Sequence, residues 1–231
     1  MPARRIEAVV LDMGGVLLPE LTSYERVARD SQLLAALREQ GVGDPESLVL
    51  EHAKRLRDAY RALEKECRQP DLDEVFAGCS AVVRRLVQGA FKRESAPAPY
   101  SFAGGVVREL ARDYRLGLVS NNALPGSHEA AALRRAGILE HLGCAVWSAS
   151  FGRRKPDPAM LLHVLESLRV PPARAVFVGD KLRTDVAAAR AAGMRSVYLR
   201  KRGAPWATRE LRPDFTLGDL RALPALVRQL G

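Results

Sequence analysis

The apolar residues of this chain form short continuous runs and longer stretches with helical spacing. The continuous runs are of strand length, and they predict buried strands at residues 6–12, 115–120, 144–148, 175–178 and 196–199 and around Phe215. The helical spacing predicts helices at residues 104–113, 127–136, 158–169, 182–192 and 218–230. Strands that alternate with helices of this length indicate an α/β fold, a doubly wound parallel sheet with helices on both faces.

A block near the N-terminus departs from this alternation because it contains helical patterns only. Its apolar spacing predicts helices at residues 24–40, about 46–68 and about 71–92. Glycines and a proline in Gly41–Pro45 separate the first two helices, and the prolines of Ala96–Pro99 end the block. The block therefore looks like an all-helical domain inserted after the first strand.

This organisation predicts two domains. Residues 1–17 and 99–231 would form a Rossmann-like core, and residues 18–98 would form a helical cap over the carboxyl edge of its sheet. The apolar helices near residues 72–91 suit either a domain core or an interface, so the sequence leaves monomer and homodimer open.

Composition places the chain among ordinary globular proteins, with 47% hydrophobic and 27% charged residues in 231. No apolar run approaches the roughly 20 residues that span a bilayer, so we expect no membrane partner. The N-terminus shows no apolar signal segment, and the three cysteines follow no disulfide or metal pattern. These features favour a cytoplasmic protein with reduced thiols.

The formal net charge of +9 comes mainly from arginines scattered along the predicted helices. Such a potential would attract a small anion, but most of these side chains are interpreted as solvated. The densest basic runs are Arg153–Lys155 and Arg200–Arg202. Neither is interleaved with aromatic residues as in single-strand binders, so nucleic acid is an unlikely partner.

Polar residues that can bind a metal or a phosphate follow several predicted strands. Taken alone, each has an ordinary explanation as a turn, helix-cap or surface residue. Together they meet at the carboxyl edge of the sheet, where open α/β folds hold their ligands. The candidate residues are Asp12, Ser120, Asn121, Lys155, Asp180 and Asp185.

In this order the residues resemble the haloacid dehalogenase-like hydrolase superfamily, along nearly the whole chain. The matching stretches are Val10–Leu17, Leu118–Asn122, Gly152–Pro158 and Val178–Asp185. The helical block resembles the cap of this superfamily, although it carries no motif that we can match. The resemblance implies a hydrolase, of the phosphatase type, that acts on a small phosphorylated substrate.

The resemblance also implies a role for each matching residue. Asp12 would be the nucleophile that forms an aspartyl-phosphate, and Asp12 and Asp180 would bind Mg²⁺ through carboxylate oxygens. The backbone carbonyl of Gly14 would supply a third oxygen, and Asp185 would act through water or by orienting a neighbour. Oxygen ligands of this kind suit Mg²⁺.

The phosphate would be held by the remaining motif residues. The resemblance assigns the transferring phosphoryl oxygens to Ser120, Asn121 and Lys155. A carboxylate that attacks a phosphate dianion meets like-charge repulsion, which Mg²⁺ and Lys155 would offset at short range. The helical cap would exclude water and select the leaving group.

One position departs from the phosphatase pattern. Phosphatases of this superfamily usually carry a second aspartate two residues after the nucleophile, where this chain has Gly14. That aspartate protonates the leaving group, and such general acid–base help is worth about 10²–10⁴-fold. The sequence therefore favours substrates with good leaving groups, such as sugar 1-phosphates, acyl phosphates or aryl phosphates. Residues that could replace the missing acid are Tyr24, Glu25, His52 and His128.

Three other functions stay open. A longer-lived aspartyl-phosphate would allow phosphotransfer to an acceptor other than water. A metal-independent 2-haloacid dehalogenase also uses an aspartate nucleophile, but the acidic pattern of Gly179–Asp185 favours a metal and phosphate. A non-catalytic protein that binds a phosphorylated ligand would explain the absence of an acid at Gly14.

Overall fold

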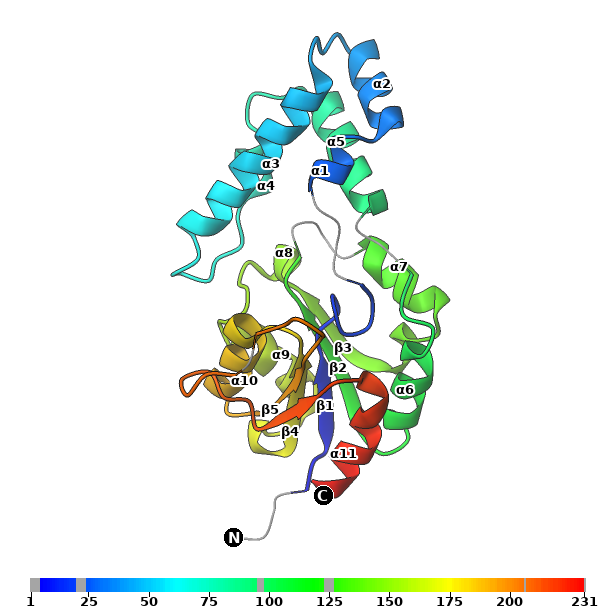
Figure 1. The fold of residues 1–231 in the computed structure, drawn as a ribbon, viewed down its shortest axis with the longest axis vertical. Helices are drawn as coiled ribbons and strands as arrows, with labels where there is room; N and C mark the ends of the chain where they lie inside the picture. The colour runs from blue at the N-terminus through cyan, green and yellow to red at the C-terminus, as the bar shows by residue number, and fades with distance from the viewer. Residues whose placement is uncertain (1–4, 20–23, 95–97, 123–126, 206, 231) are drawn as a thin grey trace.

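The structure is a computed structural model of the 231-residue chain. It describes all residues except 1–4, 20–23, 95–97, 123–126, 206 and 231. For a few residues next to these ranges it describes the backbone but not the side chains. The described residues form a sheet with flanking helices and, beyond the carboxyl ends of its strands, a group of helices (Figure 1).

The sheet has six parallel strands in the order β3-β2-β1-β4-β5-β6. Their bounds are β1 Ala8–Leu11, β2 Arg115–Ser120, β3 Leu142–Trp147, β4 Ala175–Gly179, β5 Arg195–Leu199 and β6 Phe215–Leu217. The predicted α/β class and parallel sheet are confirmed. Because the strand order reverses beside β1, the crevice for a ligand lies at the carboxyl end of this central strand.

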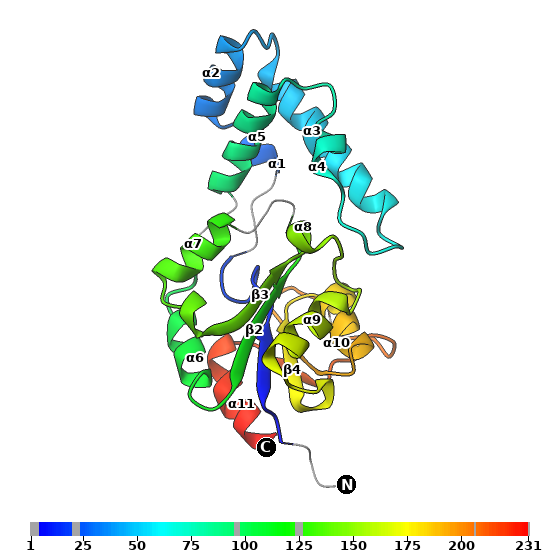
Figure 2. The same cartoon turned by 180° about the vertical axis from the view of Figure 1, so that it is seen from behind.

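Strand β1 is buried on both faces because its side chains alternate between two apolar clusters. Val9 and Leu11 pack in the cluster covered by α6 (Ala103–Leu110) and α11 (Leu223–Gln229). Ala8 and Val10 pack in the opposite cluster with α9 (Ala159–Leu168) and α10 (Ala187–Ala191). Figure 2 shows α9 and α10 on one side of the sheet and α6 and α11 on the other.

The remaining elements of the sheet region are short. Helix α7 spans Ser127–Arg135 and α8 spans Ser148–Phe151. Single helical turns occur at η1 Leu139–His141, η2 Pro172–Arg174, η3 Leu182–Val186 and η4 Leu220–Ala222. The turn η3 has π-helical hydrogen bonding and leads directly into α10.

The helices between β1 and α6 form a group that we call the helical insert. Their bounds are α1 Tyr24–Val27, α2 Ser31–Glu39, α3 Pro45–Ala62, α4 Leu72–Val75 and α5 Ala81–Glu94. Their apolar faces build a separate buried cluster that includes Leu37, Val49, Phe76 and Val87. A separate cluster is consistent with an inserted domain, while the boundaries at residues 17/18 and 98/99 stay a prediction.

Two predicted helices are each divided in the structure by a local capping group. The prediction at 24–40 missed a break at Asp30, whose carboxylate accepts hydrogen bonds from Gln32 N and Leu33 N and so starts α2. The prediction at 71–92 missed a break before α5, where the Ser80 hydroxyl accepts a hydrogen bond from Val83 N. Val82, an apolar residue of that predicted helix, is 46% exposed.

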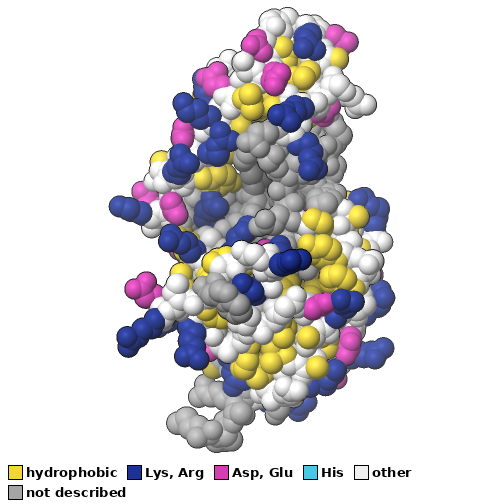
Figure 3. Space-filling view, viewed as in Figure 1, with side chains coloured by type: hydrophobic (Ala, Val, Ile, Leu, Met, Phe, Trp, Pro, Cys, Tyr) yellow, Lys and Arg dark blue, Asp and Glu magenta, His cyan; other side chains and the backbone are white. Residues whose placement is uncertain are grey.

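The surface agrees with the scattered charge of the sequence. On the face drawn in Figure 3, lysine and arginine side chains are spread over both the sheet region and the helical insert. Among the described residues, no helix combines the length and the apolar character that crossing a membrane requires.

Candidate active site

The predicted site residues meet at the carboxyl edge of the sheet. Asp12 follows β1, and its backbone N–H donates to Val178 O of β4 at 2.8 Å. A cavity of about 430 Å³ opens over Asp12. Its lining residues are Asp12, Gly14, Ser120, Asn121, Arg154, Lys155, Lys181, Thr184 and Asp185.

Lys155 is the buried cation that lines this cavity next to Asp12. Its ammonium lies 2.8 Å from Asp12 Oδ1 and 2.8 Å from Asp185 Oδ1, and it donates to Val119 O at 3.2 Å. Only 2% of the Lys155 side chain is exposed. A buried ammonium with three oxygen partners is fixed in place, so the positive charge of Lys155 stays beside Asp12 without reorganisation.

Burial and neighbouring charges perturb both partners of this ion pair. Burial raises the pKa of Asp12 to about 6, Lys155 opposes that rise, and Asp185 adds to it. Burial also acts to lower the pKa of Lys155, but the carboxylates of Asp12 and Asp185 outweigh it and raise the pKa above its usual value. Two neighbouring groups with shifted pKa values in one cavity are typical of a functional site.

Asp180 follows β4 and has a different cation as its partner. Its Oδ2 lies 2.8 Å from the ammonium of Lys201, which stands after β5. Its Oδ1 is buried and accepts no hydrogen bond from the described part of the chain. Burial raises the pKa of Asp180, and Lys201 opposes that rise.

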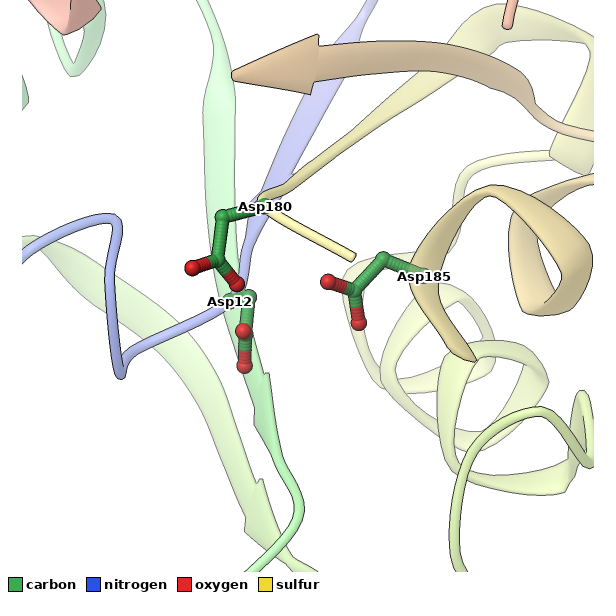
Figure 4. Close-up of side chains that lie close together, drawn as sticks. All are labelled: Asp12, Asp180 and Asp185. Atoms are coloured by element: carbon green, nitrogen blue, oxygen red, sulfur yellow. The ribbon is translucent and has the colours of Figure 1, made fainter. Parts of the chain in front are cut away.

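Three aspartates converge at this edge in a way that could hold a cation. One carboxylate oxygen each from Asp12, Asp180 and Asp185 lies within 4.8 Å of the others. Figure 4 shows the three carboxylates close together, with Asp12 and Asp180 directly after strands β1 and β4 and Asp185 in the helical turn that follows Asp180. Oxygen donors with one buried, unpartnered oxygen fit a hard divalent cation such as Mg²⁺.

The turn after β4 places Asp185. Lys181 N donates to Asp185 Oδ2 at 2.9 Å, and the π-helical turn returns the carboxylate to the strand end. A side chain at Gly179 would overlap the carboxyl group of Asp185. Glycine at the end of β4 therefore allows Asp185 to approach Lys155.

The residues at the carboxyl end of β2 are held by polar contacts inside the protein. Ser120 is buried, and its hydroxyl donates to Asn122 Oδ1 at 2.7 Å. The Asn121 amide donates to Lys155 O at 3.0 Å and accepts from Lys155 N at 2.9 Å. Besides lining the cavity, Asn121 thus fixes the backbone of Lys155.

Gly14 lines the cavity at the position where phosphatases of the superfamily that the motifs resemble usually carry an aspartate. A Cβ added there would meet no atom within 4 Å. Of the suggested substitutes, His52 is buried in the helical insert, with its Nδ1 2.6 Å from Leu48 O and its Nε2 2.9 Å from Cys79 Sγ. The side chains of Tyr24, Glu25 and His128 lie outside the described residues.

The insert also reaches the core through contacts that the sequence did not reveal. Gln69 N donates to Gly152 O at 3.0 Å, and Arg154 N donates to Cys67 O at 2.8 Å. The Ser148 hydroxyl donates to Gln69 Oε1 at 2.8 Å. These bonds join the insert to α8 and to the loop after it, which carries Lys155.

A second cavity of about 600 Å³ lies between the insert and this loop. It shares Arg154, Lys155 and Thr184 with the cavity over Asp12, and Tyr60 of the insert lines its wall. The Arg154 guanidinium lies 4.1 Å from the Tyr60 ring centroid. The adjoining space can receive the part of a ligand that extends from Asp12 toward the insert.

Comparison with known proteins identifies the family. The sequence model that describes the family of haloacid dehalogenase-like hydrolases matches residues 6–193 of this chain. The chain belongs to the haloacid dehalogenase-like hydrolase family. The resemblance inferred from the motifs is therefore confirmed, and the protein is a hydrolase.

Individual relatives carry phosphatase names. A phosphoglycolate phosphatase from Rhodospirillum rubrum is 32% identical over 234 residues, with 94% of this chain and 92% of that protein covered. A phosphoserine phosphatase from Thermus thermophilus is 32% identical over 149 residues, with 64% of this chain and 59% of that protein covered. With the latter and with a phosphoglycolate phosphatase from Cupriavidus necator, the match spans only slightly more than half of the relative.

Solved structures share the fold of this haloacid dehalogenase-like hydrolase. The 2-haloacid dehalogenase from Pseudomonas syringae superposes with a TM-score of 0.68 over 98% of this chain and 100% of that chain. The sequence identity is 24%, so this likeness shows the fold and leaves the chemistry open.

Proposed function

We propose that this chain is a Mg²⁺-dependent phosphatase of a small phosphorylated metabolite, working through an aspartyl-phosphate on Asp12. The observation that carries the proposal is the cluster at the strand ends, where three aspartates share one site and Lys155 bonds two of them. The phosphatase names of the relatives support the same chemistry.

In the proposed reaction, an oxygen of Asp12 forms a bond to phosphorus while the bond from phosphorus to the leaving group breaks. Lys155 holds an oxygen of the phosphoryl group and offsets its negative charge, with Ser120 and Asn121 beside it. Water then attacks phosphorus, releases phosphate and restores the carboxylate. The ionised form of Asp12 is required, and a cation beside it favours that form.

Asp12, Asp180, Asp185 and the carbonyl of Gly14 would hold Mg²⁺. When bound, the metal supplies positive charge that neutralises the phosphate and orients it for attack. The side chains support this assignment by charge. The three carboxylates provide negatively charged oxygens for a cation, and the ammonium groups of Lys155 and Lys201 balance part of that charge.

The empty space at Gly14 bears on the substrate. Without a carboxyl group there, the leaving group departs with less proton donation, so we expect sugar 1-phosphates, acyl phosphates or aryl phosphates to react faster than alkyl phosphates. The same gap slows water activation, which favours phosphotransfer to another acceptor as a second candidate function.

A substrate panel tests the proposal. We expect wild-type protein to hydrolyse p-nitrophenyl phosphate with Mg²⁺ and to lose that activity with a chelator. We expect Asp12→Asn to lower turnover to background, while Asp113→Asn, at an exposed aspartate of the sheet region, retains it. Phosphoglycolate and phosphoserine belong in the panel because relatives carry those names.

Two outcomes would contradict the proposal. Chloride release from a 2-haloacid in the presence of the chelator would identify a metal-independent dehalogenase. Binding of phosphorylated metabolites without any turnover in the panel would identify a non-catalytic protein.

A further inference from the structure

Lys201 lies outside the four sequence stretches that resemble the superfamily, yet its side chain contacts Asp180 of the three-aspartate cluster. It belongs to the basic run Arg200–Arg202, which sequence reasoning interprets as solvated surface. Its ammonium is 2.8 Å from Asp180 Oδ2, while 39% of the Lys201 side chain and 4% of the Asp180 side chain are exposed. The pair thus joins a buried carboxylate to a partly solvated cation.

The backbone near Gly15 is shaped around this pair. Gly15 has a φ of 79°, and an added Cβ would overlap both Asp180 Oδ2 and Lys201 Nζ. The backbone forms a turn directly after Lys201, in which Ala204 N donates a hydrogen bond to Lys201 O at 3.1 Å. The two groups therefore occupy a space that only a glycine at position 15 leaves open.

The ammonium of Lys201 serves the carboxylate rather than a substrate. Lys201 is absent from the lining of the cavity that contains Asp12 and Ser120. It contacts one oxygen of Asp180 and leaves the other, Oδ1, without a hydrogen bond from the described residues. Asp180 thus keeps a free oxygen for a cation while its negative charge is already partly balanced.

We infer that Lys201 is a resident counter-ion of Asp180, which stabilises the metal-free site and lowers its affinity for Mg²⁺. The inference rests on the metal site of the proposed function. A buried carboxylate without a cation is costly, and Lys201 reduces that cost when no metal is bound. The same positive charge repels an incoming divalent cation, although solvent around a partly exposed ammonium weakens the repulsion.

Calorimetric titration of the full chain with MgCl₂, without substrate, tests the inference. We expect Lys201→Met and Lys201→Gln to bind Mg²⁺ about three- to tenfold more tightly than wild type, because a like charge beside the ligand is gone. Lys201→Arg keeps the charge and should stay within about twofold of wild type. Arg202→Met removes a neighbouring exposed charge and should also leave the affinity within about twofold.

Thermal unfolding gives a second readout that does not depend on activity. We expect the metal-free Lys201→Met protein to have a lower Tm than wild type, and saturating Mg²⁺ to close that gap. Unchanged or weaker Mg²⁺ binding in both neutral variants, beside a wild type that binds, would overturn the inference alone. A wild type that binds no Mg²⁺ would overturn the metal site of the proposed function and the inference with it.

Discussion

The two lysines beside the acidic cluster are held in different ways. Lys155 is buried, contacts two carboxylates, and belongs to a loop that the helical insert and Asn121 fix. Lys201 is partly exposed and contacts one carboxylate from the turn after β5. An ion pair in water contributes little, whereas removing one member of a buried pair leaves an uncompensated charge. The difference separates a permanent part of the site from an exchangeable counter-ion.

The largest expected effect comes from Lys155→Met. It leaves Asp12 and Asp185 buried without their cation, so we expect a loss of about 3–5 kcal/mol in the free energy of unfolding and loss of phosphatase turnover. Urea unfolding of the metal-free protein measures the first effect. Lys181→Met, at an exposed lysine of the same cavity, should change stability by less than about 1 kcal/mol. Equal free energies of unfolding in the two variants would contradict the prediction that the buried lysine stabilises the protein more than the exposed one.

The next prediction adds a carboxyl group beside the buried pair. Because the space next to Gly14 is open, Gly14→Asp should fold and raise kcat/KM for an alkyl phosphate by about tenfold or more. Gly14→Ala fills part of the same space without an acid and should leave the rate near wild type. An unchanged rate in Gly14→Asp would mean that another group already supplies the proton.

The smallest expected effect concerns the contacts between the helical insert and the segment that carries Lys155. Lys201 is not part of that segment. Gln69→Ala removes the nearer of two acceptors of the Ser148 hydroxyl and leaves Asn122 O, so we expect kcat/KM to fall by up to about tenfold. Mg²⁺ affinity, which depends on Lys201, should stay unchanged. Gln32→Ala, at an exposed glutamine of the insert, serves as the matched control. A shift in Mg²⁺ affinity in Gln69→Ala would show that the two lysines are coupled.

The strands were predicted well because burial on both faces leaves a clear sequence signal. The runs at 115–120 and 175–178 correspond to β2 and β4 within one residue, since a continuous apolar run of that length fits a covered parallel strand. Helix ends in the insert were predicted less well. There a single side chain such as Asp30 decides where one helix stops and the next begins.

The residues of the candidate site were predicted from the order of the motifs, whereas the residues that hold them in place were not. The sequence pointed to Asp12, Lys155 and Asp185, and the structure brings them together through hydrogen-bond-length contacts. Their chemical roles stay predictions. Gln69 carries no signal in sequence, because its contact with Ser148 joins residues 79 positions apart.

The sequence by itself determined the family, the parallel sheet and the carboxylates at its edge, because apolar runs and strand-end residues are local patterns. Only the tertiary structure decided which cation each carboxylate faces. Arg153–Lys155 and Arg200–Arg202 look alike as basic runs, yet one places Lys155 in the protein interior and the other places Lys201 at its surface. Burial sets the strength of a charge interaction, and burial depends on what the whole chain packs around it.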